Sequence, residues 1–85
     1  MISIRLTHAT GLHARPAGLI AKAAQGFEAD IQLIKDNKAY NGKSIMAVLS
    51  MGAVCGDILE IKCSGADAEQ AEAAMEALIV QINAE

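Results

Sequence analysis

A histidine, an arginine and a proline stand close together near the start of the chain, in the segment 11–17 (GLHARPA). Pro16 predicts a helix that begins directly after His13, because proline has a helical φ and lacks the N–H that a first turn leaves unpaired. A helix start gathers free N–H groups and the positive end of the macrodipole, so it suits an anion such as a phosphoryl group. The same surroundings disfavour an added positive charge and favour the neutral, nucleophilic imidazole.

These residue types predict a histidine that takes up a phosphoryl group on a ring nitrogen. Arg15 has a planar donor fork that fits phosphate oxygens, and we expect it to be exposed, mobile and active mainly in the transition state. Ala14, Pro16 and Ala17 are expected to build the helix start. A lone histidine can equally be an ordinary surface or capping residue, and the surrounding motif favours the chemical interpretation.

A second segment of interest is 42–49 (GKSIMAVL), in which Ser44 is a natural N-cap for a short helix. A hydroxyl at a helix start is also open to phosphorylation, because the dipole tolerates the added charge. Ile45, Met46, Leu49 and Met51 are many apolar residues for so short a helix. They are either all core, or some of them form a partner-docking patch beside His13.

The elements that must position these segments follow from periodicity. Apolar residues alternate in 2–6, 31–35 and 57–63, which predicts strands, and 38–41 is a further short strand after a turn at Asp36-Asn37. Helices are predicted over 14–25, 45–49 and 68–83. The order strand, helix, strand, strand, helix, strand, helix indicates an α+β fold, and the polar outer positions of the strands favour an antiparallel sheet.

Some finer expectations concern the helix ends. The first helix should bury a stripe of Leu19, Ile20, Ala23 and Ala24 and end at a left-handed Gly26. The last helix should begin with a capping box of Asp67 and Gln70 and bury one stripe, formed by Ala71, Met75, Leu78 and Ile82.

Composition limits the function classes. The chain has 85 residues, which predicts a single domain over 1–85, and its net charge of −3 and 2% aromatic content argue against nucleic-acid binding. No signal peptide and no membrane span are visible, so we expect a cytoplasmic protein. The spacing of Cys55 and Cys63 fits no metal or redox motif and predicts free thiols, and His8 is expected to be a solvated residue at a strand end.

At these residues the chain resembles the HPr family, the histidine phosphocarriers of the bacterial phosphotransferase system. Segments 11–17 and 42–49 match the two signatures of the family, and the resemblance covers essentially the whole chain. It implies an open-faced β-sandwich with a four-stranded antiparallel sheet and three helices on one face (βαββαβα). It also implies that His13 is phosphorylated on Nδ1 by enzyme I and donates to sugar-specific IIA domains.

The resemblance further implies that Ser44 matches a regulatory serine, phosphorylated in some bacteria by HPr kinase/phosphorylase and read by a catabolite-control regulator. The chain is then a stoichiometric carrier, not an enzyme, with no cofactor and no metal, and we expect a monomer. One alternative is a regulatory paralogue of the nitrogen branch, which signals metabolic state without feeding sugar uptake. Another is a small metal-binding module using His8, His13 and the cysteines, which their spacing disfavours.

Overall fold

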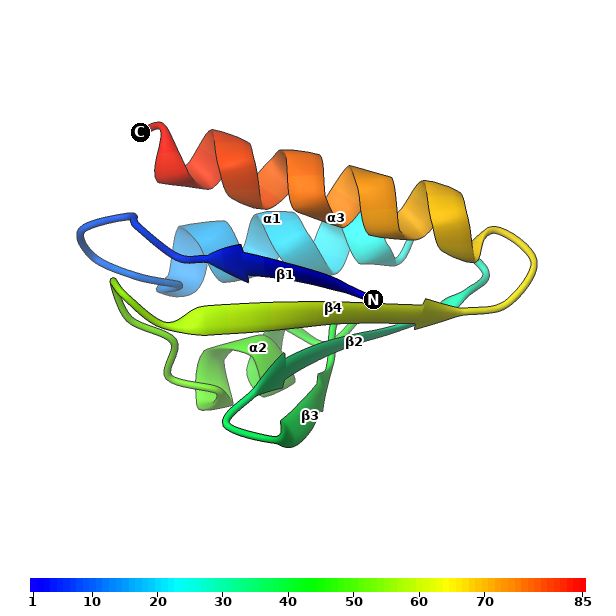
Figure 1. The fold of residues 1–85 in the computed structure, drawn as a ribbon, viewed down its shortest axis with the longest axis horizontal. Helices are drawn as coiled ribbons and strands as arrows, with labels where there is room; N and C mark the ends of the chain where they lie inside the picture. Colours follow the sequence, from blue (N-terminus) through cyan, green and yellow to red (C-terminus); the bar gives the residue numbers. More distant parts are fainter.

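The computed structural model describes residues 1–85 as one antiparallel sheet covered on one side by three helices (Figure 1). The sheet has the order β1-β4-β2-β3, and every neighbouring pair is antiparallel. The predicted α+β open-faced sandwich is therefore confirmed. The elements are β1 (Ile2–Arg5), α1 (Ala14–Ala24), β2 (Asp30–Lys35), β3 (Lys38–Asn41), α2 (Ile45–Ser50), β4 (Ile58–Ser64) and α3 (Ala68–Asn83).

The hairpin between β2 and β3 shows how local sequence determines register. Asp36 and Asn37 both adopt positive φ, at 52° and 65°, which is the backbone of a two-residue type I′ turn. This turn pairs Lys35 with Lys38 and sets the rest of the ladder. Asp and Asn tolerate this conformation better than most residues, so the predicted turn is confirmed.

The core lies between the sheet and the helices and is almost entirely aliphatic. Leu33, Leu59 and Ile61 alternate with exposed or half-buried residues along the two central strands, so one face of the sheet is apolar. Against them pack residues of α1, α2 and α3 that include Ile20, Val48, Met75, Ile79 and Ile82. The other face of the sheet carries the polar residues and no helix covers it, as the alternation predicted.

Three details of the predicted helix ends and faces are wrong. Leu19 is 39% exposed, and the buried face of α1 is instead formed by Pro16, Ala17, Ile20, Ala21 and Ala24. Gly26 is not left-handed, because α1 ends at Gln25 with right-handed backbone. In α3, Ile79 belongs to the buried stripe, whereas Leu78 is only partly buried.

The predicted capping box at the start of α3 is also wrong. Asp67 is the N-cap residue, but its carboxylate makes no capping bond. It accepts hydrogen bonds from the backbone N–H groups of Glu28 at 3.0 Å and Ala29 at 2.8 Å. These two bonds favour the charged form and lower the pKa of Asp67. A residue suited to local capping therefore ties the loop before β2 to the start of α3.

Three further features concern membrane crossing, the cysteines and the grouping of metal-binding side chains. None of the helices combines the length and the apolarity needed to cross a membrane. Cys55 and Cys63 are both free thiols, as expected, and burial raises the pKa of the Cys63 thiol. No group of three histidine, cysteine or carboxylate side chains is arranged to hold a metal ion.

Candidate functional site

His13 lies at the entrance of α1, as its N-cap residue. Its backbone is extended (φ −88°, ψ −166°), its carbonyl accepts the first helical hydrogen bond from Ala17 N–H at 2.9 Å, and its side chain makes no capping bond. The residue is exposed. The backbone N–H groups of Ala14 and Arg15 have no acceptor within the protein. The site therefore joins an unengaged imidazole to free amide donors.

A tight turn before His13 brings it to this position. Gly11 N–H donates to His8 C=O at 3.0 Å, and Gly11 has a φ of +67°. A Cβ at Gly11 would lie 2.4 Å from the carbonyl oxygen of Ala53, so only glycine fits both the conformation and the space. The next residue, Leu12, is buried and donates its N–H to Ala53 C=O at 3.1 Å. The loop is thus anchored on both sides of the turn.

Arg15 is exposed, as expected, but its guanidinium is already engaged. Its side chain is 52% exposed and forms an ion pair with the Glu85 carboxylate, which lies just beyond α3. The expected exposure is thus observed, the expected mobility stays a prediction, and the structure adds an acidic partner that the sequence did not indicate. The two residues are 70 positions apart, so their meeting depends on how α1 and α3 pack on the sheet.

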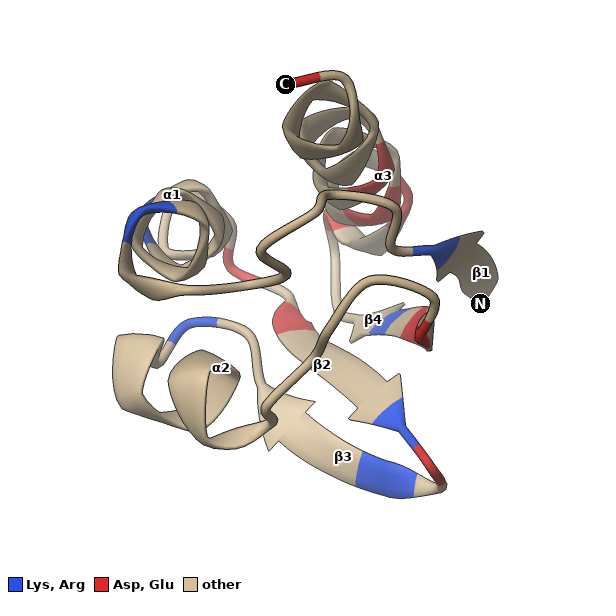
Figure 2. Cartoon of the chain, turned by 90° about the vertical axis from the view of Figure 1, so that its left-hand side faces the viewer, with Lys and Arg blue, Asp and Glu red and all other residues tan.

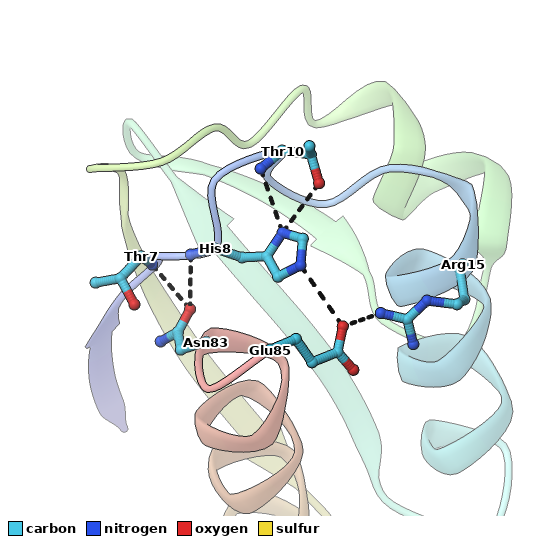
Figure 3. Close-up of polar contacts among 6 residues, drawn as sticks. All are labelled: Thr7, His8, Thr10, Arg15, Asn83 and Glu85. Carbon is cyan, nitrogen blue, oxygen red and sulfur yellow. Dashed lines mark hydrogen bonds and ion pairs between the residues drawn. The ribbon is translucent and has the colours of Figure 1, made fainter.

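His8 is the site residue that sequence reasoning missed, because it is not a solvated residue at a strand end. Its side chain is only 12% exposed, and its ring centroid lies 5.9 Å from that of His13. Its Nδ1 accepts from Thr10 N–H at 3.3 Å and lies 3.0 Å from Thr10 Oγ1. Its Nε2 lies 3.5 Å from Glu85 Oε1 (Figure 3). No local sequence pattern predicts the cluster of His8, Arg15 and Glu85, since Glu85 is distant in sequence from the other two residues.

Ser44 caps α2 as predicted. Its Oγ accepts a hydrogen bond from Ala47 N–H at 3.1 Å, and its carbonyl accepts from Val48 N–H at 3.0 Å. The residue is half-buried. The hydroxyl thus stabilises the helix start and remains partly accessible.

The four apolar residues predicted as a docking patch divide between the surface and the core. Met46 is 72% exposed and Ile45 is also exposed, whereas Leu49 is half-buried. Met51 is 3% exposed and belongs to the core, so its assignment to a surface patch is wrong. Leu19 of α1 was not predicted there and is exposed on the neighbouring helix, which packs against α2.

Charge is absent from the surface of α2, which carries no lysine, arginine, aspartate or glutamate (Figure 2). Gly18 of the adjoining α1 lies beside this helix, since a Cβ built there would be in ordinary van der Waals contact with the Ile45 side chain, at 3.5 Å. We call the exposed apolar residues Leu19, Ile45 and Met46, with half-buried Leu49, the α1/α2 patch.

The molecule is thus an open-faced sandwich with an exposed histidine at the start of its first helix. Residues 2–81 match the family profile described as PTS HPr component phosphorylation site. The chain is 43% identical over 76 residues to phosphocarrier protein HPr of Treponema pallidum, covering 89% of this chain and 86% of that protein. The chain belongs to the HPr family of phosphocarrier proteins of the phosphotransferase system, which act in sugar transport through a phosphohistidine.

Solved structures agree with this assignment. The crystal structure of HPr from Thermoanaerobacter tengcongensis is similar with a TM-score of 0.92 at 39% identity, covering 99% of this chain and 94% of that one. The catabolite-repression protein Crh of Bacillus subtilis, described as a dimer with a swapped domain, is similar with a TM-score of 0.78 at 34% identity, covering 96% and 92%.

Proposed function

We propose that this chain accepts a phosphoryl group on His13 from enzyme I and passes it to sugar-specific IIA domains. The observation that carries the proposal is the exposed, unbonded His13 ring beside the free N–H groups of Ala14 and Arg15. A carrier needs an accessible nucleophile and donors for the transferred oxygens, and this site supplies both. In this role the chain is a substrate of its partners and not itself an enzyme.

The proposed step is an in-line transfer. The lone pair of His13 Nδ1 attacks the phosphorus of phospho-enzyme I, and the bond between phosphorus and the donor atom of enzyme I breaks as the new P–N bond forms. The α1 dipole offsets the arriving negative charge by about 0.3–2 kcal/mol. Arg15 can add charge-assisted hydrogen bonds, but its guanidinium must first leave Glu85. A carrier gains from this competition, because a product held too tightly could not be handed on.

The α1/α2 patch is proposed to be the surface on which these partners dock. It is apolar and uncharged at its centre, and one of its residues, Leu19, lies on α1, the helix that begins directly after His13. Methionine adapts its shape to different surfaces, which suits a protein that must meet more than one partner. A shared patch of this kind favours transient, mutually exclusive complexes.

Ser44 is proposed to regulate docking when it is phosphorylated by an HPr kinase. The half-buried hydroxyl lies at the start of α2, directly before Ile45 and Met46. A phosphate there would be tolerated by the helix and would place a dianion at the rim of the α1/α2 patch. Partners with acidic residues at that point would then bind less tightly.

The test is phosphorylation by purified enzyme I and phosphoenolpyruvate, followed by treatment with acid. Wild type should gain one phosphate that is lost in acid, as phosphohistidine is, and His13→Ala should gain none while melting at the wild-type temperature. His8→Ala removes the only other histidine and should still gain the acid-labile phosphate when phosphoenolpyruvate is in excess. An acid-labile phosphate on His13→Ala would contradict the proposal.

Arg15 is tested in the same assay. Arg15→Ala should slow transfer by about tenfold or more, because a charged hydrogen bond contributes about 1.5–3 kcal/mol, and it should change stability little. Arg15→Lys separates charge from geometry, since lysine keeps the charge without the fork. Unchanged transfer rates in Arg15→Ala would remove this residue from the step.

A further inference from the structure

The cluster His8, Glu85 and Arg15 is a feature that the transfer step does not yet use (Figure 3). One carboxylate oxygen, Glu85 Oε1, is shared by two partners: the Arg15 guanidinium and, at 3.5 Å, His8 Nε2. The His8 ring is mostly buried and lies next to His13. Glu85 therefore connects the second histidine of the chain to the arginine of the phosphorylation site.

The tautomer of the neutral His8 ring follows from its hydrogen bonds. Thr10 N–H can only donate, so His8 Nδ1, which accepts it, carries a lone pair and no proton. The proton of the neutral ring is therefore on Nε2, the atom that faces the Glu85 carboxylate. Thr10 thus determines the tautomer that can donate toward Glu85.

The end of α3 is held in place for this contact. Asn83 Oδ1 accepts from the N–H groups of Thr7 at 2.8 Å and His8 at 3.3 Å, and Asn83 Nδ2 donates to Arg5 C=O at 2.9 Å. These three bonds join the last turn of α3 to the segment that leads into the site. Because Asn83 is anchored in this way, Glu85, two residues later, is held close to the site.

We propose that His8 is a positioning residue that retains the Glu85 carboxylate when Arg15 leaves it for the phosphoryl group on His13. This inference rests on the proposed role of His13 and Arg15. Without His8, the departure of Arg15 would leave Glu85 close to a phosphoryl dianion with no donor from the protein. With His8, the carboxylate keeps one N–H partner. The free-energy cost of moving Arg15 from Glu85 to the phosphoryl group is then lower, and the phosphorylated state is stabilised.

The test compares two chains directly. Unphosphorylated wild type and His8→Ala, distinguished by mass through isotope labelling, are mixed with a catalytic amount of enzyme I and a limiting amount of phosphoenolpyruvate. Phosphoryl groups then exchange between them until equilibrium, with one P–N bond broken for each one formed. The ratio of phosphorylated chains in a native mass spectrum reports relative phosphoryl affinity and does not depend on docking rates.

The expected result is about two- to fivefold less phosphate on His8→Ala than on wild type, the lower end of the range for one hydrogen bond, as suits a 3.5 Å contact between a neutral N–H and a carboxylate. When Glu85→Gln competes with the double variant His8→Ala/Glu85→Gln, the two chains should carry nearly equal amounts of phosphate, because the carboxylate that His8 retains is gone. His8→Gln keeps a side-chain N–H donor and should recover part of the loss. Glu69→Gln, at the far end of α3, controls for the change in net charge.

Three results would overturn the inference: equal phosphate on His8→Ala and wild type, more phosphate on His8→Ala, or the same loss in the Glu85→Gln background. The last result would show that His8 acts without Glu85, for example through the fold. Failure of the proposed function is distinguishable, because wild type itself would then take up no acid-labile phosphate. In that case phosphoramidate, a small N–P donor, shows whether His13 can be phosphorylated without enzyme I.

Discussion

Replacing Ser44 in two ways should separate the stability of α2 from the docking of partners. Ser44 Oγ accepts a hydrogen bond from Ala47 N–H at 3.1 Å, which caps the start of this helix. Ser44→Ala removes the acceptor and adds no charge. Ser44→Asp retains an acceptor, since aspartate is among the best N-cap residues, and adds a negative charge.

The two variants should change the free energy of unfolding differently. Loss of the cap in Ser44→Ala should cost about 1 kcal/mol, which in a domain of this size lowers Tm by about 4–8 °C. Ser44→Asp keeps the bond and gains about 0.3–1 kcal/mol from the helix dipole, so its Tm should equal or exceed that of wild type. Ser50→Asp, at the other end of the same helix, should be destabilised, because it places the charge at the negative end of the dipole and loses the hydrogen bond from Ser50 Oγ to Ala47 C=O at 2.8 Å.

The order should reverse for binding to enzyme I measured by isothermal titration calorimetry. Ser44→Ala should bind like wild type, because Ile45 and Met46 remain exposed and uncharged. Ser44→Asp should bind about tenfold more weakly, because its charge must be desolvated or faces acidic groups of the partner. If Ser44→Asp were as unstable as Ser44→Ala, the capping role would be refuted. If Ser44→Asp bound enzyme I as tightly as wild type does, the proposed regulatory role of Ser44 would be refuted.

Four further substitutions test the fold and the patch. Gly11→Ala should lose about 1–3 kcal/mol in urea unfolding, because its φ is +67° and its Cβ would lie 2.4 Å from Ala53 O; a wild-type midpoint would contradict this. Met46→Ala should weaken enzyme I binding by about 1 kcal/mol with no change in Tm, because Met46 is exposed. Met51→Ala should lower the free energy of unfolding by about 2–5 kcal/mol, because Met51 is in the core. The opposite pattern would refute the division of these residues between surface and core. The folded-state pKa of Asp67 lies below its ordinary value of 3.8, so its stabilisation is present above that pH and is lost as the pH falls through the folded value. The stability gap between wild type and Asp67→Asn should therefore close in acid unfolding below about pH 4, and a gap that persists there would refute it.

Much of this protein was readable from its sequence because the signals are local. Alternation of apolar residues located the strands, and Asp36-Asn37 set the hairpin turn and its register. Pro16 marked the start of α1, which placed His13 at the helix entrance, and Ser44 capped α2 as its residue type predicted. Each of these depends on dihedral preferences and hydrogen bonds within a few residues, which sequence specifies directly.

Sequence misled where one residue type can satisfy two partners. Asp67 and Gln70 have the spacing of a capping box, but the Asp67 carboxylate binds the backbone of Glu28 and Ala29 instead. Met51 follows Met46 in the same apolar run, yet one is buried and the other exposed. In both cases the choice depends on which distant segment packs alongside, and a local pattern does not carry that information.

Sequence alone therefore determined the fold class, the helix that presents His13 and the capping of α2, because these follow from periodicity and from local backbone chemistry. Only the tertiary structure decided that Glu85 meets Arg15 and His8. That contact needs α1 and α3 to lie side by side on the sheet and Asn83 to hold the chain entering the site. An ion pair across 70 residues is a product of packing geometry, and no spacing along the chain encodes it.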